Sequence, residues 1–298
     1  MEHISEILKQ FPGTPHQDAL PNSTKRKATF EAKKCDICGK EYQLWVFHRD
    51  TEDYYQKPCS DCRNKQIAEE SSQRLKEGLQ AVIDSVQGKW FDEIIFPSRF
   101  IEKASEGFKS FNRELQPKAY DVIKNYDNKS IVLSSPELYG VGKTHLVCCL
   151  AWHLLESKEA AKILGGGYIK YPCPVFIITE TNLLSRIRET YNKHEDPKAE
   201  TEEQVFKKLA GYETLIIDDV GKVRPKDYAF LQSVYFRIID NAYTAEHSII
   251  ITTNLSFKDL EEHIGGACAD RLREMAGSPD NFVSMKGKSM RGKTTNDK

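Results

Sequence analysis

The chain has 298 residues, of which 39% are hydrophobic, and this is enough for one large α/β domain with an appendage. Lys and Arg number 43 against 44 Asp and Glu, so the net charge of −1 excludes a polycation that coats nucleic acid non-specifically. No apolar run approaches the roughly 20 residues of a membrane span, and the N-terminus lacks a signal pattern. We expect a cytosolic protein.

Residues 1–34 form a polar N-terminal segment that we expect to be flexible. A short helix from Ile4 to Phe11 is indicated, followed by the basic run Lys25-Arg26-Lys27. This segment could dock on a partner as a helix, and a frayed chain terminus is an equally good interpretation.

Residues 35–62 contain two Cys-x-x-Cys turns separated by 20 residues. The four thiols are those of Cys35, Cys38, Cys59 and Cys62. Two such turns complete a tetrahedral Zn²⁺ site with no open position. Disulfides, which a cytosolic setting disfavours, and unliganded thiols are the alternatives. The spacer has enough apolar residues for a small hairpin, and metal binding would supply the folding free energy of so small a module.

Residues 63–89 are charged and helix-forming, with a thin apolar stripe through residues 67–82, and we predict a helical linker. Aromatic residues follow at Phe96, Phe100, Phe108 and Phe111, before a helix over residues 119–126. These rings either brace the following domain or border a bound nucleobase, and bracing is the more frequent role.

From Ile131 onward, apolar strand patterns alternate with helical patterns. This alternation predicts a parallel sheet covered by helices on both faces, with ligands bound at the carboxyl ends of the strands. The expected strands are 131–134, 175–179, 213–217, 248–252 and 282–285; the expected helices are 143–157, 181–192, 202–210, 226–243 and 257–275.

A glycine turn follows the first of these strands and precedes a Lys-Thr pair. The sequence Gly140-Val141-Gly142-Lys143-Thr144-His145 is typical of a loop that binds a nucleoside triphosphate. Backbone N–H groups point at phosphate oxygens, Lys143 reaches the β- and γ-phosphates, and the Thr144 hydroxyl ligates Mg²⁺. Glu137 stands where this pattern expects its first glycine, so we expect its carboxylate to point outward.

Two later strands also end in polar residues. Asp218 and Asp219 follow a continuous apolar run, and Asn254 follows the run that ends at Thr253. We expect Asp218 to hold Mg²⁺, Asp219 to polarise the attacking water, and Asn254 to contact the γ-phosphate or that water. A chance Gly-Lys-Thr turn would not explain three such strand ends in this order.

Roughly residues 90–293 resemble the AAA+ replicative-helicase loaders of the DnaC/DnaI type and the related IstB-type transposition helper ATPases. Five blocks carry the resemblance: residues 140–146, 215–222, 249–255, 270–275 and 287–291. It implies an AAA+ P-loop NTPase fold, a three-layer α-β-α arrangement with a parallel sheet, over residues 90–298. The zinc module and the helical linker would precede it.

The resemblance also implies roles for three arginines. Arg271 matches the finger that reaches a neighbouring subunit's nucleotide, Arg273 is its competitor, and Arg291 matches a sensor of the bound nucleotide. A finger supplied in trans implies an ATP-dependent homo-oligomer. The basic candidates for contact with single-stranded DNA are Lys222, Arg224 and Lys226, and a solvated loop is the alternative for them.

The leading hypothesis is an ATPase that loads a hexameric replicative helicase onto single-stranded DNA, in a bacterium or its phage, with residues 1–86 docking the helicase. The expected cofactors are ATP, Mg²⁺ and Zn²⁺. An IstB-type helper that assembles on duplex DNA is the second hypothesis. A zinc-dependent adaptor in which ATP is only a folding ligand is the third.

Overall fold

A computed structural model describes residues 28–48, 53–54, 57–136, 138–164, 167–191, 200–223, 228–287 and 289. The chain forms two compact units, Met1–Lys76 and Glu77–Lys298. Among the described helices, none is long and apolar enough to cross a membrane.

The first unit contains a small antiparallel sheet. Strand β1 (Ala28–Lys34) pairs with β2 (Glu41–His48), and β2 pairs with β3 (Asp53–Tyr54). The predicted spacer hairpin therefore includes a strand from the segment that the sequence indicated to be flexible. Seven pairs, from Ala28 with Phe47 to Lys34 with Glu41, join β1 to β2 in a hairpin.

Helix α2 (Ser60–Glu93) is longer than the predicted linker helix, and the division between the units falls inside it. Its later part belongs to the second unit, where Val86 and Trp90 are buried. The apolar stripe thus becomes a packing surface only in the last turns of the helix.

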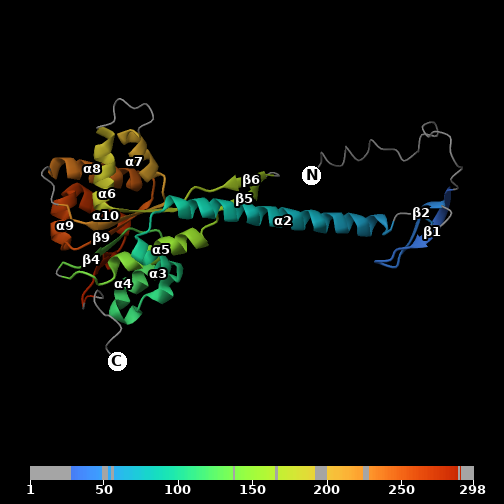
Figure 1. Cartoon of the computed structure of the whole chain (residues 1–298), viewed down its shortest axis with the longest axis horizontal. Helices are drawn as coiled ribbons and strands as arrows, with labels where there is room; N and C mark the ends of the chain where they lie inside the picture. Colours follow the sequence, from blue (N-terminus) through green and yellow to red (C-terminus); the bar gives the residue numbers. More distant parts are fainter. Residues whose placement is uncertain are drawn as a thin grey trace. The chain divides into compact units, whose positions relative to one another are not determined.

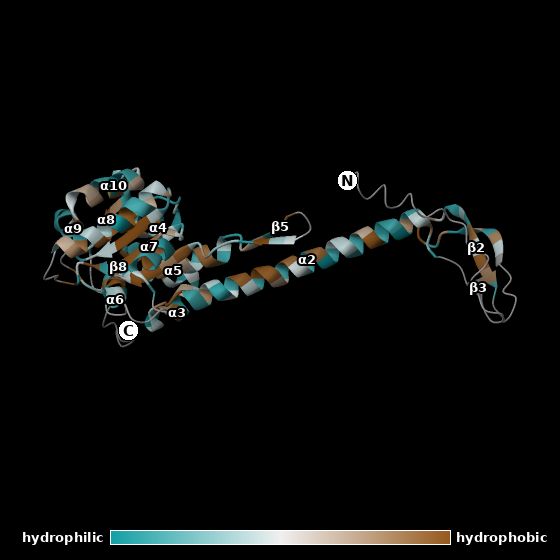
Figure 2. Cartoon of the chain, turned by 90° about the horizontal axis from the view of Figure 1, so that it is seen from above, coloured by the Kyte–Doolittle hydropathy of each residue, from teal (hydrophilic) through white to brown (hydrophobic). Residues whose placement is uncertain are grey.

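The second unit contains a five-stranded parallel sheet in the order β10 (Phe282–Ser284), β4 (Ile131–Ser134), β9 (Ser248–Thr253), β8 (Thr214–Val220), β7 (Val175–Thr179). Alternate residues of each strand pack into two separate apolar clusters, one on each face of the sheet. Ile216 and Ile250 lie in one cluster, and Ile217 and Ile251 lie in the other. Figure 2 shows these strands as a hydrophobic interior. Burial on both faces explains why the strands are continuously apolar.

Helices cover both faces of the sheet (Figure 1). One face is covered by α3 (Ser98–Ser105), α4 (Pro117–Lys124) and α5 (Lys143–Ser157), together with the end of α2. The other face is covered by α6 (Glu180–Tyr191), α7 (Glu202–Ala210), α8 (Tyr228–Thr244), α9 (Phe257–Ile264) and α10 (Gly266–Ala276). The predicted three-layer α-β-α arrangement with a parallel sheet is confirmed.

Two features differ from the expected elements. The predicted single helix over 257–275 is wrong, because α9 and α10 are separated at Gly265, whose φ of 93° is incompatible with a continuing helix. A hairpin that the sequence did not indicate, β5 (Ala161–Leu164) with β6 (Gly167–Lys170), lies beside α2 (Figure 1). The Tyr168 hydroxyl of β6 lies so near Gly78 of α2 that a Cβ there would be 2.5 Å from it, so a larger residue at position 78 would displace the tyrosine side chain.

Candidate functional site

The loop between β4 and α5 has the backbone of a phosphate-binding turn. Gly140 and Gly142 adopt φ values of 78° and 99°, which side chains rarely tolerate. Gly142 is the N-cap of α5 and makes no side-chain cap, so the first N–H groups of the helix remain available to an anion. Val141 is fully buried beneath the loop and anchors it.

Lys143 is buried and held between two strand ends. Its Nζ donates hydrogen bonds to Ser135 Oγ at 2.5 Å and to Asn254 Oδ1 at 2.6 Å. Ser135 follows β4 and Asn254 follows β9, its neighbour in the sheet. The structure therefore brings together two residues, Lys143 and Asn254, that are 111 positions apart.

Asp218 lies in β8 and is held by two hydroxyl groups. Thr144 Oγ1 donates to both carboxylate oxygens at 3.1 Å, and Thr252 Oγ1 donates at 2.5 Å. Burial raises the pKa of Asp218, and the neighbouring Asp219 raises it further against the opposing effect of the hydroxyls. A carboxylate beside a threonine hydroxyl is a suitable ligand set for Mg²⁺.

Asp219 adopts a left-handed backbone, with φ of 59°, and its N–H donates to Thr252 Oγ1 at 3.0 Å. This turn directs its carboxylate into the cavity that the phosphate loop also lines. Lys222 Nζ lies 2.6 Å from Asp219 Oδ2 and lines the same cavity. Lys222, expected only as a DNA contact, is therefore also a neighbour of the predicted catalytic carboxylate.

The cavity has a volume of about 220 Å³. Its walls include Lys143, Thr144, Asp219 and Asn254, as predicted. They also include residues that sequence reasoning did not assign to the site: Arg99, Phe100, Lys103 and Tyr139. Arg99 and Lys103 come from α3, and their positive charges suit phosphate groups. The only sequence feature that pointed to this side of the cavity was the group of aromatic residues around Phe100, for which a border of the nucleobase was one of two interpretations.

His145 lines the cavity, but its ring also packs away from the loop. Its Nε2 lies 2.8 Å from Ser110 Oγ, and its ring stacks on that of Phe100. Burial lowers the pKa of His145 to about 4, with Lys103 adding a smaller effect, so the ring is neutral at pH 7. A packing role for the ring is the simplest interpretation of these contacts.

Neither finger candidate lines the cavity of its own chain. Arg271 Nη1 lies 2.9 Å from Asp240 Oδ1, an ion pair without hydrogen-bond geometry, and its guanidinium lies 4.7 Å from the centre of the Phe236 ring. Arg273 pairs with Glu261. Glu137, Arg224, Lys226 and Arg291 lie outside the described residues.

A buried carboxylate that the sequence did not reveal supports the loop after Asp219. Glu180 is fully buried, and its Oε2 accepts a hydrogen bond from Gly221 N–H at 2.9 Å. Its Oε1 lies 2.7 Å from both Tyr235 OH and His263 Nε2. Glu180 thus fixes the backbone beside Asp219, the predicted catalytic carboxylate.

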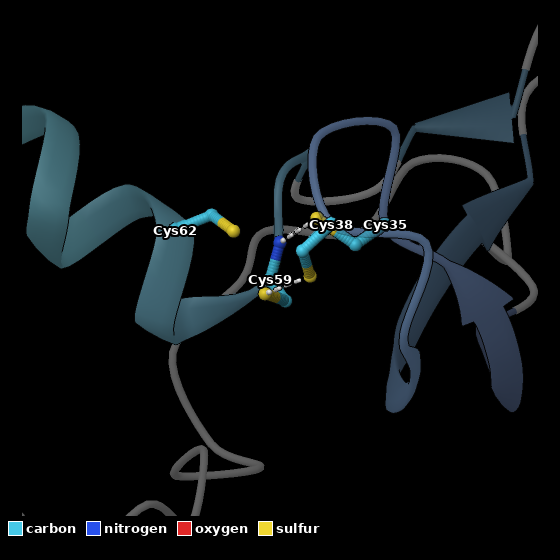
Figure 3. A group of neighbouring side chains, drawn as sticks. All are labelled: Cys35, Cys38, Cys59 and Cys62. Atoms are coloured by element: carbon cyan, nitrogen blue, oxygen red, sulfur yellow. Dashed lines mark hydrogen bonds between the residues drawn. The ribbon is translucent and has the colours of Figure 1, made fainter.

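The four cysteines predicted to bind zinc converge in the first unit (Figure 3). Their Sγ atoms all lie within 4.8 Å of one another, and those of Cys38 and Cys59 are 3.8 Å apart. About 3.8 Å is also the edge of a tetrahedron with Zn–S bonds of about 2.3 Å. Backbone N–H donors, that of Cys38 first, lower the pKa of Cys35 to about 6, whereas hydrogen bonding with Cys38 and burial raise the pKa of Cys62 to about 12. This set fits a structural Zn²⁺ ion.

The chain was compared with known families and structures. The family model of the IstB-like ATP binding protein matches residues 110–298. No curated protein matches the chain.

Three solved structures are similar to part of the chain. AMPPCP-bound DnaA from Aquifex aeolicus is 17% identical, with a TM-score of 0.46, over 60% of this chain and 50% of that one. The DnaC helicase loader is 20% identical, with a TM-score of 0.44, over 63% and 98%. DnaI is 14% identical, with a TM-score of 0.41, over 62% and 90%. The chain therefore spans about half of that DnaA and nearly all of that DnaC chain. Because the family model covers well over half of the sequence, the chain belongs to the family of IstB-like ATP-binding proteins.

Proposed function

We propose that the chain is an ATPase that loads a replicative DNA helicase onto single-stranded DNA in a bacterium or a phage-infected cell, in the cytosol. The observation that carries the ATPase part is the convergence of Lys143, Asn254, Thr144 and Asp218 from three strand ends. This arrangement suits a triphosphate with Mg²⁺, whose charge would be stabilised by the loop and by Lys143.

Asp219 is the residue that we propose to polarise the attacking water. Its carboxylate lines the cavity near Asn254 and is only partly exposed. The ion pair with Lys222 competes with that role, because Lys222 Nζ donates a hydrogen bond to Asp219 Oδ2, an oxygen that would otherwise be available to the water. We infer that Lys222 moves away from Asp219 before hydrolysis, for example toward a DNA phosphate.

The loader role rests on the resemblance, and the four-cysteine module before the ATPase unit supports docking of a protein partner. Arg271 is our candidate finger, with assembly of several copies completing each site. The second candidate is a transposition helper on duplex DNA, which the family match to IstB-like proteins supports as well.

Nucleotide binding and turnover test the ATPase. Lys143→Ala should reduce ATP affinity at least 100-fold, since a buried ammonium at the phosphates is lost, whereas exposed Lys109→Ala should bind normally. Arg271→Ala should retain ATP binding and lose DNA-stimulated hydrolysis. Normal turnover by Arg271→Ala, with loss in Arg273→Ala, would move the finger to Arg273.

Partner capture separates the two roles. A helicase loader should co-purify with a replicative helicase and bind single strands. ATP-dependent filaments on duplex DNA without helicase capture would establish the transposition helper instead. Saturable ATP binding with no turnover under any of these conditions would support the third hypothesis, a zinc-dependent adaptor in which ATP is only a folding ligand.

A further inference from the structure

Glu180 binds the backbone on both sides of Lys222. It is the first residue of α6, directly after β7, and its side chain is fully buried. Its Oε2 accepts hydrogen bonds from Gly221 N–H at 2.9 Å and from Val223 N–H at 3.4 Å. A buried carboxylate needs such partners, because it has no water to bind. One oxygen atom therefore anchors the two residues that flank Lys222.

The other oxygen of Glu180 is held by two helices on the same face of the sheet. Tyr235 OH of α8 donates to Oε1 at 2.7 Å, and His263 Nε2 of α9 lies 2.7 Å from the same atom. Both of these side chains are buried, and their rings pack with centroids 6.1 Å apart. Because its partners cannot move freely, the Glu180 side chain is fixed, and so is the backbone that it binds.

The loop from Val220 to Val223 has little freedom of its own. Gly221 adopts a φ of 87°, and a Cβ at this position would overlap with the Leu255 side chain. Thr253 Oγ1 donates to Val220 O at 2.7 Å. Close packing against the end of β9 and the hydrogen bonds to Glu180 together define one path for this loop.

This path places the ammonium group of Lys222 on Asp219. Lys222 Nζ donates to Asp219 Oδ2 at 2.6 Å, and both residues line the nucleotide cavity. The Lys222 side chain is 59% exposed, so its own packing does not hold it there. An exposed ion pair with a flexible lysine contributes little by itself. A fixed backbone beside the carboxylate favours the pair, because it raises the effective concentration of the ammonium there.

We propose that Glu180 is a positioning residue that keeps Lys222 paired with Asp219, and so restrains hydrolysis until Lys222 is drawn away. Asp219 is our candidate for polarising the attacking water, so the consequence for turnover rests on the proposed function. While the backbone stays bound to Glu180, release requires only rotation of the lysine side chain. An anion that binds the ammonium, such as a DNA phosphate, shifts the population toward a free Asp219.

Chemical labelling of lysine amines tests the position of Lys222 without ATP. The full zinc-loaded chain is treated with acetic anhydride, and mass spectrometry of the peptide that contains Lys222 gives the labelling rate. Glu180→Gln replaces one acceptor oxygen by an NH₂ group, which accepts no hydrogen bond. The Lys222 rate should therefore rise by about threefold or more in this variant. Exposed Glu203→Gln should match the wild type, and Asp219→Asn, which removes the partner of Lys222, should give the upper limit.

ATP turnover tests the restraint itself, at protein concentrations where turnover per chain is constant. Glu180→Gln and Lys222→Ala should each raise kcat without DNA by about threefold or more at unchanged KM, and DNA should stimulate them less than the wild type. The double variant should match Lys222→Ala alone, because Glu180 acts through Lys222. A residue with a purely structural role would lower turnover when replaced. Glu203→Gln should again behave as the wild type.

Tyr235→Phe is a second variant that tests the proposal if Glu180→Gln does not fold. It removes one of the two groups that hold Oε1, so it should change the labelling rate and kcat in the same direction by a smaller factor. Thermal melting and ATP affinity show that each variant is folded.

Three outcomes would overturn the proposal. The first is equal labelling of Lys222 in Glu180→Gln, Tyr235→Phe and the wild type. The second is lower or unchanged turnover without DNA in a folded variant that binds ATP normally. The third is additivity of Glu180→Gln and Lys222→Ala in the double variant. If the wild type binds ATP and never hydrolyses it, the proposed ATPase fails, whereas faster labelling in Glu180→Gln would still establish that Glu180 positions Lys222.

Discussion

The two units of this chain are stabilised in different ways. In the second unit, a parallel sheet is buried between two apolar clusters, and side chains from three strand ends are held by hydrogen bonds around one cavity. In the described part of the first unit, Cys35, Val46 and Cys59 are the buried side chains of the core. Two of these three are candidate metal ligands. From this difference we predict that the large unit folds without a ligand, whereas the small unit requires a metal ion.

Removing two thiols from the first unit should have the largest effect. Structural zinc sites in small modules contribute about 10–16 kcal/mol, more than so small a core provides. The double replacement Cys59→Ser and Cys62→Ser should abolish zinc binding and unfold the β1–β2–β3 sheet, as measured by metal content and proteolysis. ATP binding by the second unit should persist. Cys268→Ala, which removes a thiol from the second unit, should leave the zinc content unchanged. A loss of ATP binding in the double variant would show that the units fold together.

Removing the buried carboxylate of Glu180 should have the next largest effect, and it tests whether the second unit depends on polar contacts as well as on its core. Glu180→Ala leaves His263, Tyr235 and Gly221 N–H without their acceptor. Breaking such a buried arrangement costs about 3–5 kcal/mol in the free energy of unfolding. Tyr235→Phe, which removes one hydroxyl, should cost about 1–2 kcal/mol in urea unfolding. A loss below 1 kcal/mol for Glu180→Ala would mean that the apolar clusters alone hold the loop.

The smallest predicted effect is a pH dependence of the stability of the second unit, and it comes from the ionisation of Asp218. Burial raises the pKa of Asp218 above its ordinary value of 3.8, so the folded chain binds this proton more tightly than the unfolded chain does. Without Mg²⁺ and ATP, the stability of the second unit should therefore fall as the pH rises from about 4 through the raised pKa. Asp218→Asn should remove this fall.

Thermal melting of Asp218→Asn tests the sign of that effect. At pH 7 the variant should melt about 2–4 °C above the wild type without ligand, which is roughly 1 kcal/mol for a domain of this size. It should gain less than the wild type from Mg²⁺ with ATP, because a metal ligand is lost. Exposed Asp92→Asn should melt like the wild type. A lower melting temperature for Asp218→Asn without ligand would show that the hydroxyl contacts outweigh burial.

Local patterns in the sequence predicted most of the second unit. The strand 131–134 and the helices 143–157 and 202–210 have the predicted bounds, because apolar runs and helical periodicity are set by neighbouring residues. The phosphate loop was readable for the same reason, since two glycines must precede Lys143 for its backbone to turn. The polar residues at strand ends indicated that Asp218 and Asn254 lie at the same edge of the sheet. The break at Gly265 was missed, because a glycine within a helical pattern does not reveal its φ value.

By itself, the sequence determined the parallel α/β fold, the membership of the family, the four thiols that could share a metal, and the residue types of the nucleotide site. Tertiary structure alone decided that Arg99 and Lys103 line the cavity and that Glu180 supports the loop beside Asp219. The physical reason is distance along the chain. Periodicity and turn chemistry act over a few residues, whereas a burial partner or an ion pair is chosen among all residues that the fold brings near.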